Sequence, residues 1–237
     1  MNLVARNING TNLKSHEIER AIWFDIEKQM ADKQPSVTGL LVDGEFSITV
    51  HDSRLQLGAK YSNLSYQPAY DFYDELIQRC QLEKRLLISY TKADFDFVLE
   101  SNPGLSTRMK EVYQKAKFTS FFKYKHPELY NEMQNALSRR YKNRRNRYMV
   151  MKKQNGEFVI GLKDMLKLDA VGYPDLKKVG IGGSATAISK IRRRFEKTGY
   201  DLDALTTGEK KAWSKMLNYL KHDVYGLQHL TKWVNSQ

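Results

Sequence analysis

Cysteine is almost absent from this sequence, with a single one, Cys80, among 237 residues. One cysteine excludes an internal disulfide framework and any metal centre built from several cysteines. The scarcity favours a reducing, intracellular compartment. A metal site in this chain would therefore have to use oxygen or imidazole ligands.

Long apolar runs are also missing. No stretch approaches the 18 or so apolar residues of a membrane-spanning helix, and residues 1–10 lack the apolar core of a signal peptide. We therefore expect a cytoplasmic protein without a membrane partner. The hydrophobic content of 41% is still enough for the core of one sizeable domain.

Nucleotide-binding fingerprints and internal repeats are absent as well. The glycine-rich segment Ile181-Gly182-Gly183-Ser184 has neither the spacing of a dinucleotide-binding loop nor that of a P-loop. We interpret it as a turn. The pattern gives no support to a Rossmann-type or P-loop nucleotide enzyme.

Acidic residues are scarce relative to basic ones, and the formal net charge is +12. Residues 101–155 contain 14 Lys/Arg and 3 Asp/Glu, which leaves 25 and 24 for the rest of the chain. The basicity is thus one block in a nearly neutral protein, and it indicates a polyanionic partner. We expect residues 102–155 to form a basic, aromatic-rich insert within a single domain that spans residues 1–237.

Cations and aromatic residues alternate in this block, a composition that suits a DNA or RNA strand, because cations neutralise phosphates and aromatic rings stack on bases. A solvated helical face over structural aromatics is the alternative interpretation. A second cationic run follows on a predicted helix, where an ordinary exposed surface is equally plausible. The candidate nucleic-acid contacts are Arg139, Arg140, Lys142, Arg144, Arg145, Arg147, Arg192 and Arg193.

Strand and helix patterns predict a mixed α/β fold. Residues 37–42 and 45–50 are β-rich runs joined by Asp43-Gly44, a strong signal for a hairpin. With the strand at 21–24 they form an antiparallel meander. A helix opened by Pro68 has the length of a crossover, so the strand at 85–90 is expected to lie parallel to the first. We read residues 51–66 as a loop and residues 158–162 as a further strand.

Acidic residues stand where these elements end. Asp25 and Glu27 share one face of the first strand, where two close carboxylates call for a cation such as Mg²⁺ or Mn²⁺. Asp94 and Asp96 begin the helix after the fourth strand. On the last helix, which a capping box of Thr206 and Glu209 begins, Tyr219 and Asp223 are four residues apart and point the same way.

In this order, the motifs resemble the DEDD superfamily of 3′-5′ exonucleases, in particular its tyrosine-containing branch, which has a ribonuclease H-like fold. The segments that carry the resemblance are Phe24-Asp25-Ile26-Glu27, Tyr90-Thr91-Lys92-Ala93-Asp94-Phe95-Asp96-Phe97, Asp175-Leu176-Lys177-Lys178-Val179 and Tyr219-Leu220-Lys221-His222-Asp223-Val224. Many members have Asn shortly before the acid of the second motif, whereas this chain has Thr91 and Lys92. The assignment there stays open between Asp96, which fits the motif better, and Asp94.

The resemblance implies a two-metal-ion nuclease acting on DNA or RNA. Asp25 would bridge two Mg²⁺ or Mn²⁺ ions, and Glu27 and Asp223 would complete the ligands of the first ion. The second-motif acid, Asp96 or alternatively Asp94, would act mainly through metal-bound water. Tyr219 would orient the attacking water. The alternative is a non-catalytic nucleic-acid-binding protein on a degenerate scaffold of the same fold. The nuclease hypothesis would fail if Asp223 faced away from Asp25 and Glu27, or if a lysine ammonium occupied the gap between them.

Overall fold

The computed structural model describes residues 13–29, 32, 34–142, 153–154, 156–175 and 184–237. Six strands form a mixed sheet in the order β4-β3-β2-β1-β5-β6. These strands are β1 (Ile22–Glu27), β2 (Val37–Val42), β3 (Glu45–Val50), β4 (Ser65–Tyr66), β5 (Leu87–Ser89) and β6 (Tyr113–Lys115). A short hairpin of β7 (Lys153–Gln154) and β8 (Glu157–Phe158) lies apart from this sheet.

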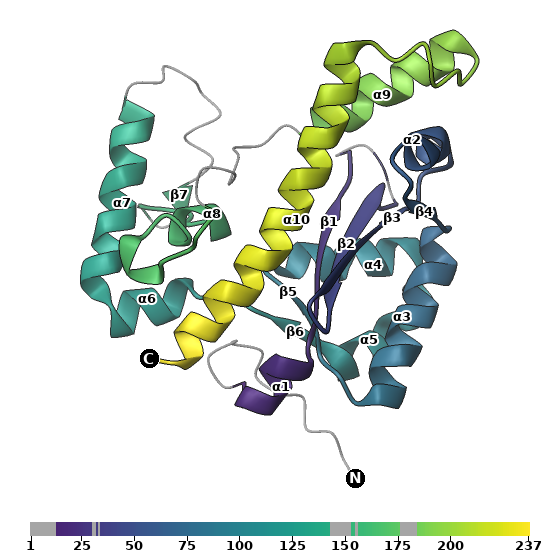
Figure 1. Cartoon of the computed structure of the whole chain (residues 1–237). Helices are drawn as coiled ribbons and strands as arrows, with labels where there is room; N and C mark the ends of the chain where they lie inside the picture. The colour runs from purple at the N-terminus through teal and green to yellow at the C-terminus, as the bar shows by residue number, and fades with distance from the viewer. Residues whose placement is uncertain (1–12, 30–31, 33, 143–152, 155, 176–183) are drawn as a thin grey trace.

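Helices flank the sheet on both faces (Figure 1). In chain order they are α1 (Ser15–Arg20), α2 (Gln56–Tyr61), α3 (Ala69–Glu83), α4 (Lys92–Ser101), α5 (Ser106–Val112), α6 (Thr119–Lys125), α7 (Pro127–Lys142), α8 (Leu162–Met165), α9 (Ser184–Thr198) and α10 (Thr207–Asn235). Short 3-10 turns cover Ser53–Leu55, Pro103–Leu105 and Asp169–Val171. No helix among these described residues is long and apolar enough to cross a membrane.

The predicted meander is confirmed. Strands β1 and β2 are antiparallel, as are β2 and β3, and the turn residues Asp43 and Gly44 have φ of 52° and 86°. Positive φ at both positions is the conformation that a two-residue type I′ turn needs. The predicted parallel pairing of β1 with β5 is also present, with Ile22 opposite Leu87. The structure therefore has the mixed α/β sheet that the strand pattern indicates.

Successive residues of β1 face opposite layers of the molecule. Ile22, Phe24 and Ile26 are buried in a core with α3, α4 and α5, which cover one face of the sheet. Trp23 is buried in a separate core that includes residues of α10, and α10 crosses the other face in Figure 1. Because side chains alternate along a strand, Asp25 also lies on the α10 face.

A glycine allows α10 to approach the sheet closely. Gly39 of β2 pairs with Asp25 of β1, and a Cβ atom at Gly39 would lie 2.8 Å from Cγ of Leu220. A larger residue would therefore push α10 outward at the turn that carries Asp223. The close approach places the last helix within reach of the carboxylates of the first strand.

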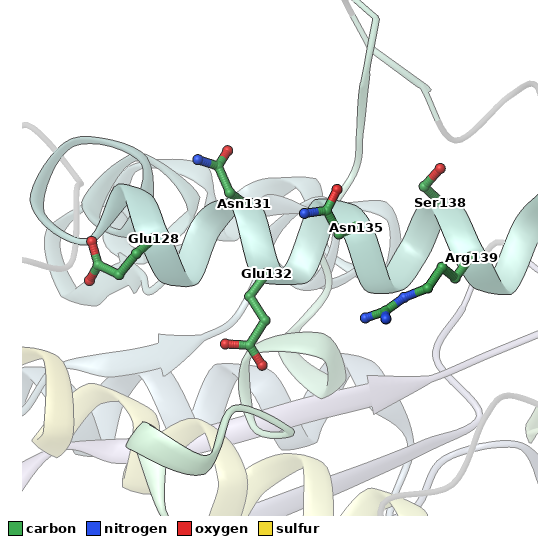
Figure 2. Close-up of a pocket in the computed structure, with 6 residues that line it drawn as sticks. All are labelled: Glu128, Asn131, Glu132, Asn135, Ser138 and Arg139. Carbon is green, nitrogen blue, oxygen red and sulfur yellow. The ribbon is translucent and has the colours of Figure 1, made fainter.

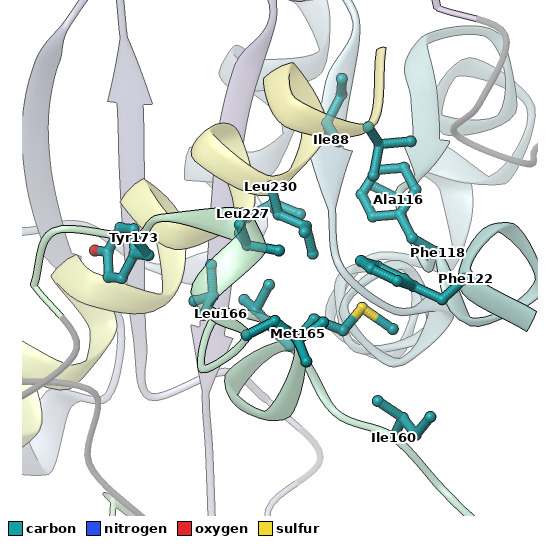
Figure 3. Close-up of a cluster of buried hydrophobic side chains, with 14 of the residues drawn as sticks. Ile88, Ala116, Phe118, Phe122, Ile160, Met165, Leu166, Tyr173, Leu227 and Leu230 are labelled. Carbon is teal, nitrogen blue, oxygen red and sulfur yellow. The ribbon is translucent and has the colours of Figure 1, made fainter. Parts of the chain in front are cut away.

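Helices α6 and α7 of the basic block and the later α8 lie on the far side of α10, where Figure 1 shows them as a group. Apolar side chains from this group join one buried cluster with α10, drawn in Figure 3, which contains Phe118, Phe122, Met165, Leu227 and Leu230. The insert begins later than predicted. Helix α5 and strand β6 lie within residues 102–155, yet β6 pairs with β5 and α5 belongs to the sheet core. The start at residue 102 is therefore wrong.

Two further local predictions fail. Residues 51–66, expected to be a loop, contain α2 and β4, and Leu55 and Ala59 are buried in the core. Residues 158–162, expected to be a strand, instead span the end of β8 and the start of α8. A short apolar run does not distinguish a strand from a buried turn of helix. The helix that we expect after this segment, through Met165 and Leu166, is present as α8, which carries Lys163 into the acidic site.

Candidate metal site

Three carboxylates from opposite ends of the chain meet between β1 and α10. Asp25, Glu27 and Asp223 each offer one oxygen, and these oxygens lie within 4.8 Å of one another. Strand alternation puts the two β1 side chains on one face, and the close approach at Gly39 brings α10 over them. The three oxygens form a set that suits a hard divalent cation such as Mg²⁺ or Mn²⁺.

The two oxygens of Asp223 have different surroundings. Oδ2 is 2.9 Å from Nζ of Lys163, whereas Oδ1 is buried and has no hydrogen-bond partner among the residues that the structure describes. A buried carboxylate oxygen without a partner is costly in a folded protein, unless a cation or water satisfies it. Oδ1 of Asp223 is therefore the atom of the site that most needs a ligand.

Lys163 is the group whose presence would argue against a metal ion. Its ammonium pairs with Asp223, and its positive charge also acts on Asp25 and Glu27. One ammonium does not balance the cluster, however. Three carboxylates and one lysine leave a formal charge of −2, from three negative charges and one positive. That remainder equals the charge of one divalent ion.

Of the two candidates for the second-motif acid, Asp94 is the one that lies beside this cluster. It is buried, and its charge acts on Asp25, whereas Asp96 has a half-exposed side chain paired with Lys92 at 3.1 Å. The preference for Asp96 is therefore reversed. The position on α4 explains the difference, because Asp94 lies one turn before the buried Val98 and so shares its face of the helix.

Hydrogen-bond donors surround the carboxylate of Asp94. The hydroxyl of Ser89 and the backbone N–H groups of Ile26, Asp94 and Thr91 favour the ionised form and act to lower its pKa. Burial outweighs these hydrogen bonds and raises the pKa of Asp94 to about 7. Asp94 thus ties the start of α4 to β1.

Tyr219 and Ser184 complete the surroundings of the acids. Tyr219 is buried on α10, one turn before Asp223, and the ammonium groups of Lys163 and Lys215 each lie 5.3 Å from its ring centre. Ser184, the first residue of α9, donates a 2.7 Å hydrogen bond to Oε1 of Glu27. The site is therefore assembled from β1, α8, α9 and α10, with α4 beside it.

Burial is the main cause of raised pKa values throughout the cluster. It raises the pKa of Asp25 well above its usual range, and the neighbouring Asp94, Asp223 and Glu27 carboxylates raise it further. Burial also raises the pKa of Glu27, against the hydrogen bond from Ser184, and that of Asp223, against Lys163. The negative charges in this site thus oppose one another, and a cation would relieve them.

These shifts predict a pH dependence of stability. A carboxyl group whose pKa is higher in the folded state stabilises the protein at low pH, and this contribution is lost as the pH rises through the folded value, about 7 for Asp94. His51 acts in the opposite sense, because burial lowers its pKa to about 4 and it destabilises the fold as the pH falls below about 6.5. At pH 6.5 the imidazole of His51 is half protonated in the unfolded state, and at pH 8 it is neutral in both states, so between these pH values it offsets only part of the carboxylate effect.

In that interval we expect the urea midpoint of the protein in EDTA to fall as the pH rises. Mg²⁺ or Mn²⁺ should raise the midpoint most at pH 8, where the carboxylates are ionised. The measurement is urea unfolding at pH 6.5 and pH 8.0, with and without the ion. A midpoint that rises with pH in EDTA would contradict the assigned shifts.

The predicted nucleic-acid contacts divide into three groups. Arg139 and Arg193 are exposed. Arg140 pairs with Asp164 at 3.2 Å, and Arg192 is buried among carboxylates, so the prediction for Arg192 as a surface contact is wrong. The remaining predictions fall on Arg144, Arg145 and Arg147, which lie outside the described residues, and on Lys142, whose side chain is likewise not described.

The surface pocket drawn in Figure 2 is not this site. It lies along α7, with Glu128 and Glu132 toward one end and Arg139 toward the other. None of the clustered carboxylates lines it. The acids are packed between elements rather than placed in that hollow.

Sequence reasoning missed Lys163 and Ser184. Ser184 follows the glycine-rich segment that we interpreted as a turn, and a helix start there would have pointed to it. Lys163 comes 60 residues before Asp223, on a helix of four residues, and no motif marks it. No match to the chain was found among protein-family models, curated proteins or solved structures.

Proposed function

We propose that this chain is a divalent-metal-dependent nuclease on a ribonuclease H-like fold, which hydrolyses phosphodiester bonds in DNA or RNA as a 3′-5′ exonuclease. The observation that supports this most is the convergence of Asp25, Glu27 and Asp223 within 4.8 Å, with one buried oxygen of Asp223 unpartnered. The mixed six-stranded sheet flanked by helices is compatible with that fold.

Each residue has a defined part in the proposed reaction. Asp25, Glu27 and Asp223 would hold the ion. A bound divalent ion lowers the pKa of a water molecule and stabilises the negative charge on the leaving oxygen. The hydroxyl of Tyr219 would orient the attacking water, and Ser184 fixes the rotamer of Glu27. The water oxygen bonds to phosphorus and gives up a proton. The bond from phosphorus to the sugar O3′ breaks, and O3′ keeps the electron pair and takes up a proton.

A second candidate function is supported by the Lys163–Asp223 ion pair. If this ammonium is the permanent counter-ion of the cluster, the chain would be a nucleic-acid-binding protein without catalysis. The basic block would then be the functional surface and the acids a structural remnant. The formal charge of −2 that remains beside Lys163 favours the nuclease.

A cleavage assay separates these two functions. End-labelled DNA and RNA oligonucleotides are incubated with the protein in Mn²⁺, in Mg²⁺ or in EDTA, and the products are resolved on a denaturing gel. The nuclease predicts a ladder that starts at the 3′ end and vanishes in EDTA. Binding without cleavage in either metal would contradict it.

The salt dependence of binding tests the basic block. Replacing Arg144, Arg145 and Arg147 by glutamine should weaken binding of a single strand and lower the slope of log K against log salt by about 2. The matched control is Arg79→Gln on α3, across the sheet, which should leave the slope unchanged. Fluorescence anisotropy in EDTA from 50 to 300 mM NaCl measures both. An unchanged slope in the triple variant would place the contact surface elsewhere.

A further inference from the structure

The site has ligands for one divalent ion but few for a second. A second ion beside Asp25 would need the acid of the second motif, and that acid is Asp94. This carboxylate is buried, and it is not among the three whose oxygens lie within 4.8 Å of one another. Asp96, paired with Lys92 on the surface, does not replace it.

Lys163 is held within the carboxylate cluster, paired with Asp223 and with its charge acting on Asp25 and Glu27. Its helix is anchored on both sides, because Met165 and Leu166 are fully buried. Asp164 accepts a 3.1 Å hydrogen bond from the N–H of Gly161 and pairs with Arg140. The ammonium lies 2.9 Å from Asp223 and over the ring of Tyr219. These contacts fix Lys163 inside the site, with its side chain only a quarter exposed.

We propose that this site works with one divalent ion, and that the ammonium of Lys163 takes the place of the second by binding a non-bridging oxygen of the scissile phosphate. The proposal rests on the nuclease function proposed above. The three carboxylates that lie within reach of one ion leave a formal charge of −2 beside Lys163, which one divalent ion neutralises. Lys163 is then a catalytic residue, because it touches the substrate.

The charges of Lys163 and of the ion also oppose each other, which gives the proposal a readout other than activity. Removing the ammonium should strengthen binding of Mn²⁺ by about tenfold or more, since both cations share Asp223. The same change should slow cleavage by about 10²–10³-fold, because a preorganised donor to the developing negative charge is lost. A residue that only supports the fold would not move these two quantities in opposite directions.

The experiment counts the Mn²⁺ ions bound to the full chain, by electron paramagnetic resonance of free Mn²⁺ and by calorimetry. We expect one Mn²⁺ for each wild-type chain, and tighter binding with slower cleavage in Lys163→Met. Lys167→Met, an exposed lysine one turn further on, is the control and should match the wild type in both. Lys163→Arg keeps the positive charge, so it should bind Mn²⁺ as weakly as the wild type. This variant replaces Lys163→Met in the experiment if Lys163→Met does not fold.

Two outcomes would overturn the role of Lys163 but leave the nuclease function standing. In the first, a wild-type chain that cleaves binds two Mn²⁺ ions. In the second, Lys163→Met cleaves at the wild-type rate. An absence of both Mn²⁺ binding and cleavage in the wild type would instead contradict the nuclease function itself, and this inference would fall with it. The two failures are therefore distinguishable in one set of measurements.

Discussion

Replacing Asp25 by asparagine is expected to abolish metal-dependent cleavage, with a loss of about 10³-fold or more, while strand binding persists. Asp25 lies at the centre of the three-carboxylate cluster, and an amide oxygen without charge is a poor ligand for Mg²⁺ or Mn²⁺. A catalytic metal ion contributes several kcal/mol to transition-state stabilisation, and each 1.36 kcal/mol corresponds to about tenfold in rate.

The same substitution should stabilise the protein in EDTA at pH 8. The Asp25 carboxylate is buried beside Asp94, Glu27 and Asp223, so its charge opposes folding, and asparagine removes the charge with little change of volume. Urea unfolding and the gel assay measure the two effects on one variant. A combined loss of binding, cleavage and stability would show that Asp25 supports the fold instead.

Asp96→Asn is the matched control for this experiment. Asp96 is also an aspartate close to the second motif, but its side chain is half-exposed and paired with Lys92. An exposed pair of this kind contributes little to stability. We expect cleavage and the urea midpoint to stay at wild-type values, and a strong loss of cleavage would restore Asp96 as the second-motif acid.

Replacing Arg192 by alanine is expected to cost about 3–5 kcal/mol of unfolding free energy, the largest loss of stability that we predict. The Arg192 guanidinium is buried between the carboxylates of Asp32 and Asp52. It also donates to Oε1 of Gln29 at 2.6 Å and to Oγ of Ser36 at 2.7 Å. Without the guanidinium, two carboxylates in the interior lose their main counter-ion, although Arg54 still contacts both.

Arg193→Ala is the control one residue further along α9, because Arg193 is exposed. It should leave the unfolding free energy within about 0.5 kcal/mol of the wild type. Replacing Arg193 should weaken nucleic-acid binding, whereas replacing Arg192 should have no direct effect on it. Equal urea midpoints for the two variants would contradict the buried position of Arg192.

Local signals in the sequence were enough for much of the fold. The Asp43-Gly44 turn, the length of the crossover to β5 and the capping box of Thr206 and Glu209 all have short-range physical causes. Each is present in the structure. The same signals also put Asp25 and Glu27 on one face and Tyr219 in the turn before Asp223, so the acidic part of the site was predictable.

Two of the errors had a signal that was overlooked. Arg192 comes four residues after Ile188 and three before Phe195, both buried, so helical spacing puts it on the inner face of α9. Asp94 comes four residues before the buried Val98, so helical spacing likewise puts it on the inner face of α4. In both cases a charged residue was assigned from its type, although its position along the helix decided its surroundings.

Lys163 could not be predicted in this way. Its place beside Asp223 depends on how α8 packs against α10, where a Cβ atom at Gly226 would collide with the side chain of Leu166. Such a contact joins residues about 60 positions apart and leaves no periodic pattern in either segment. Contacts of this range are set by the packed core, which a single sequence does not reveal.

The order of the elements along the chain has a consequence during translation. Asp223 is synthesised 196 residues after Glu27 (223 − 27), which takes a ribosome roughly 10–40 s at typical rates. Helix α7 and its basic surroundings emerge well before α10 does. Under the proposed function, a nascent chain would hold RNA before it could cut it, and the messenger that encodes the protein would be spared until α10 has docked.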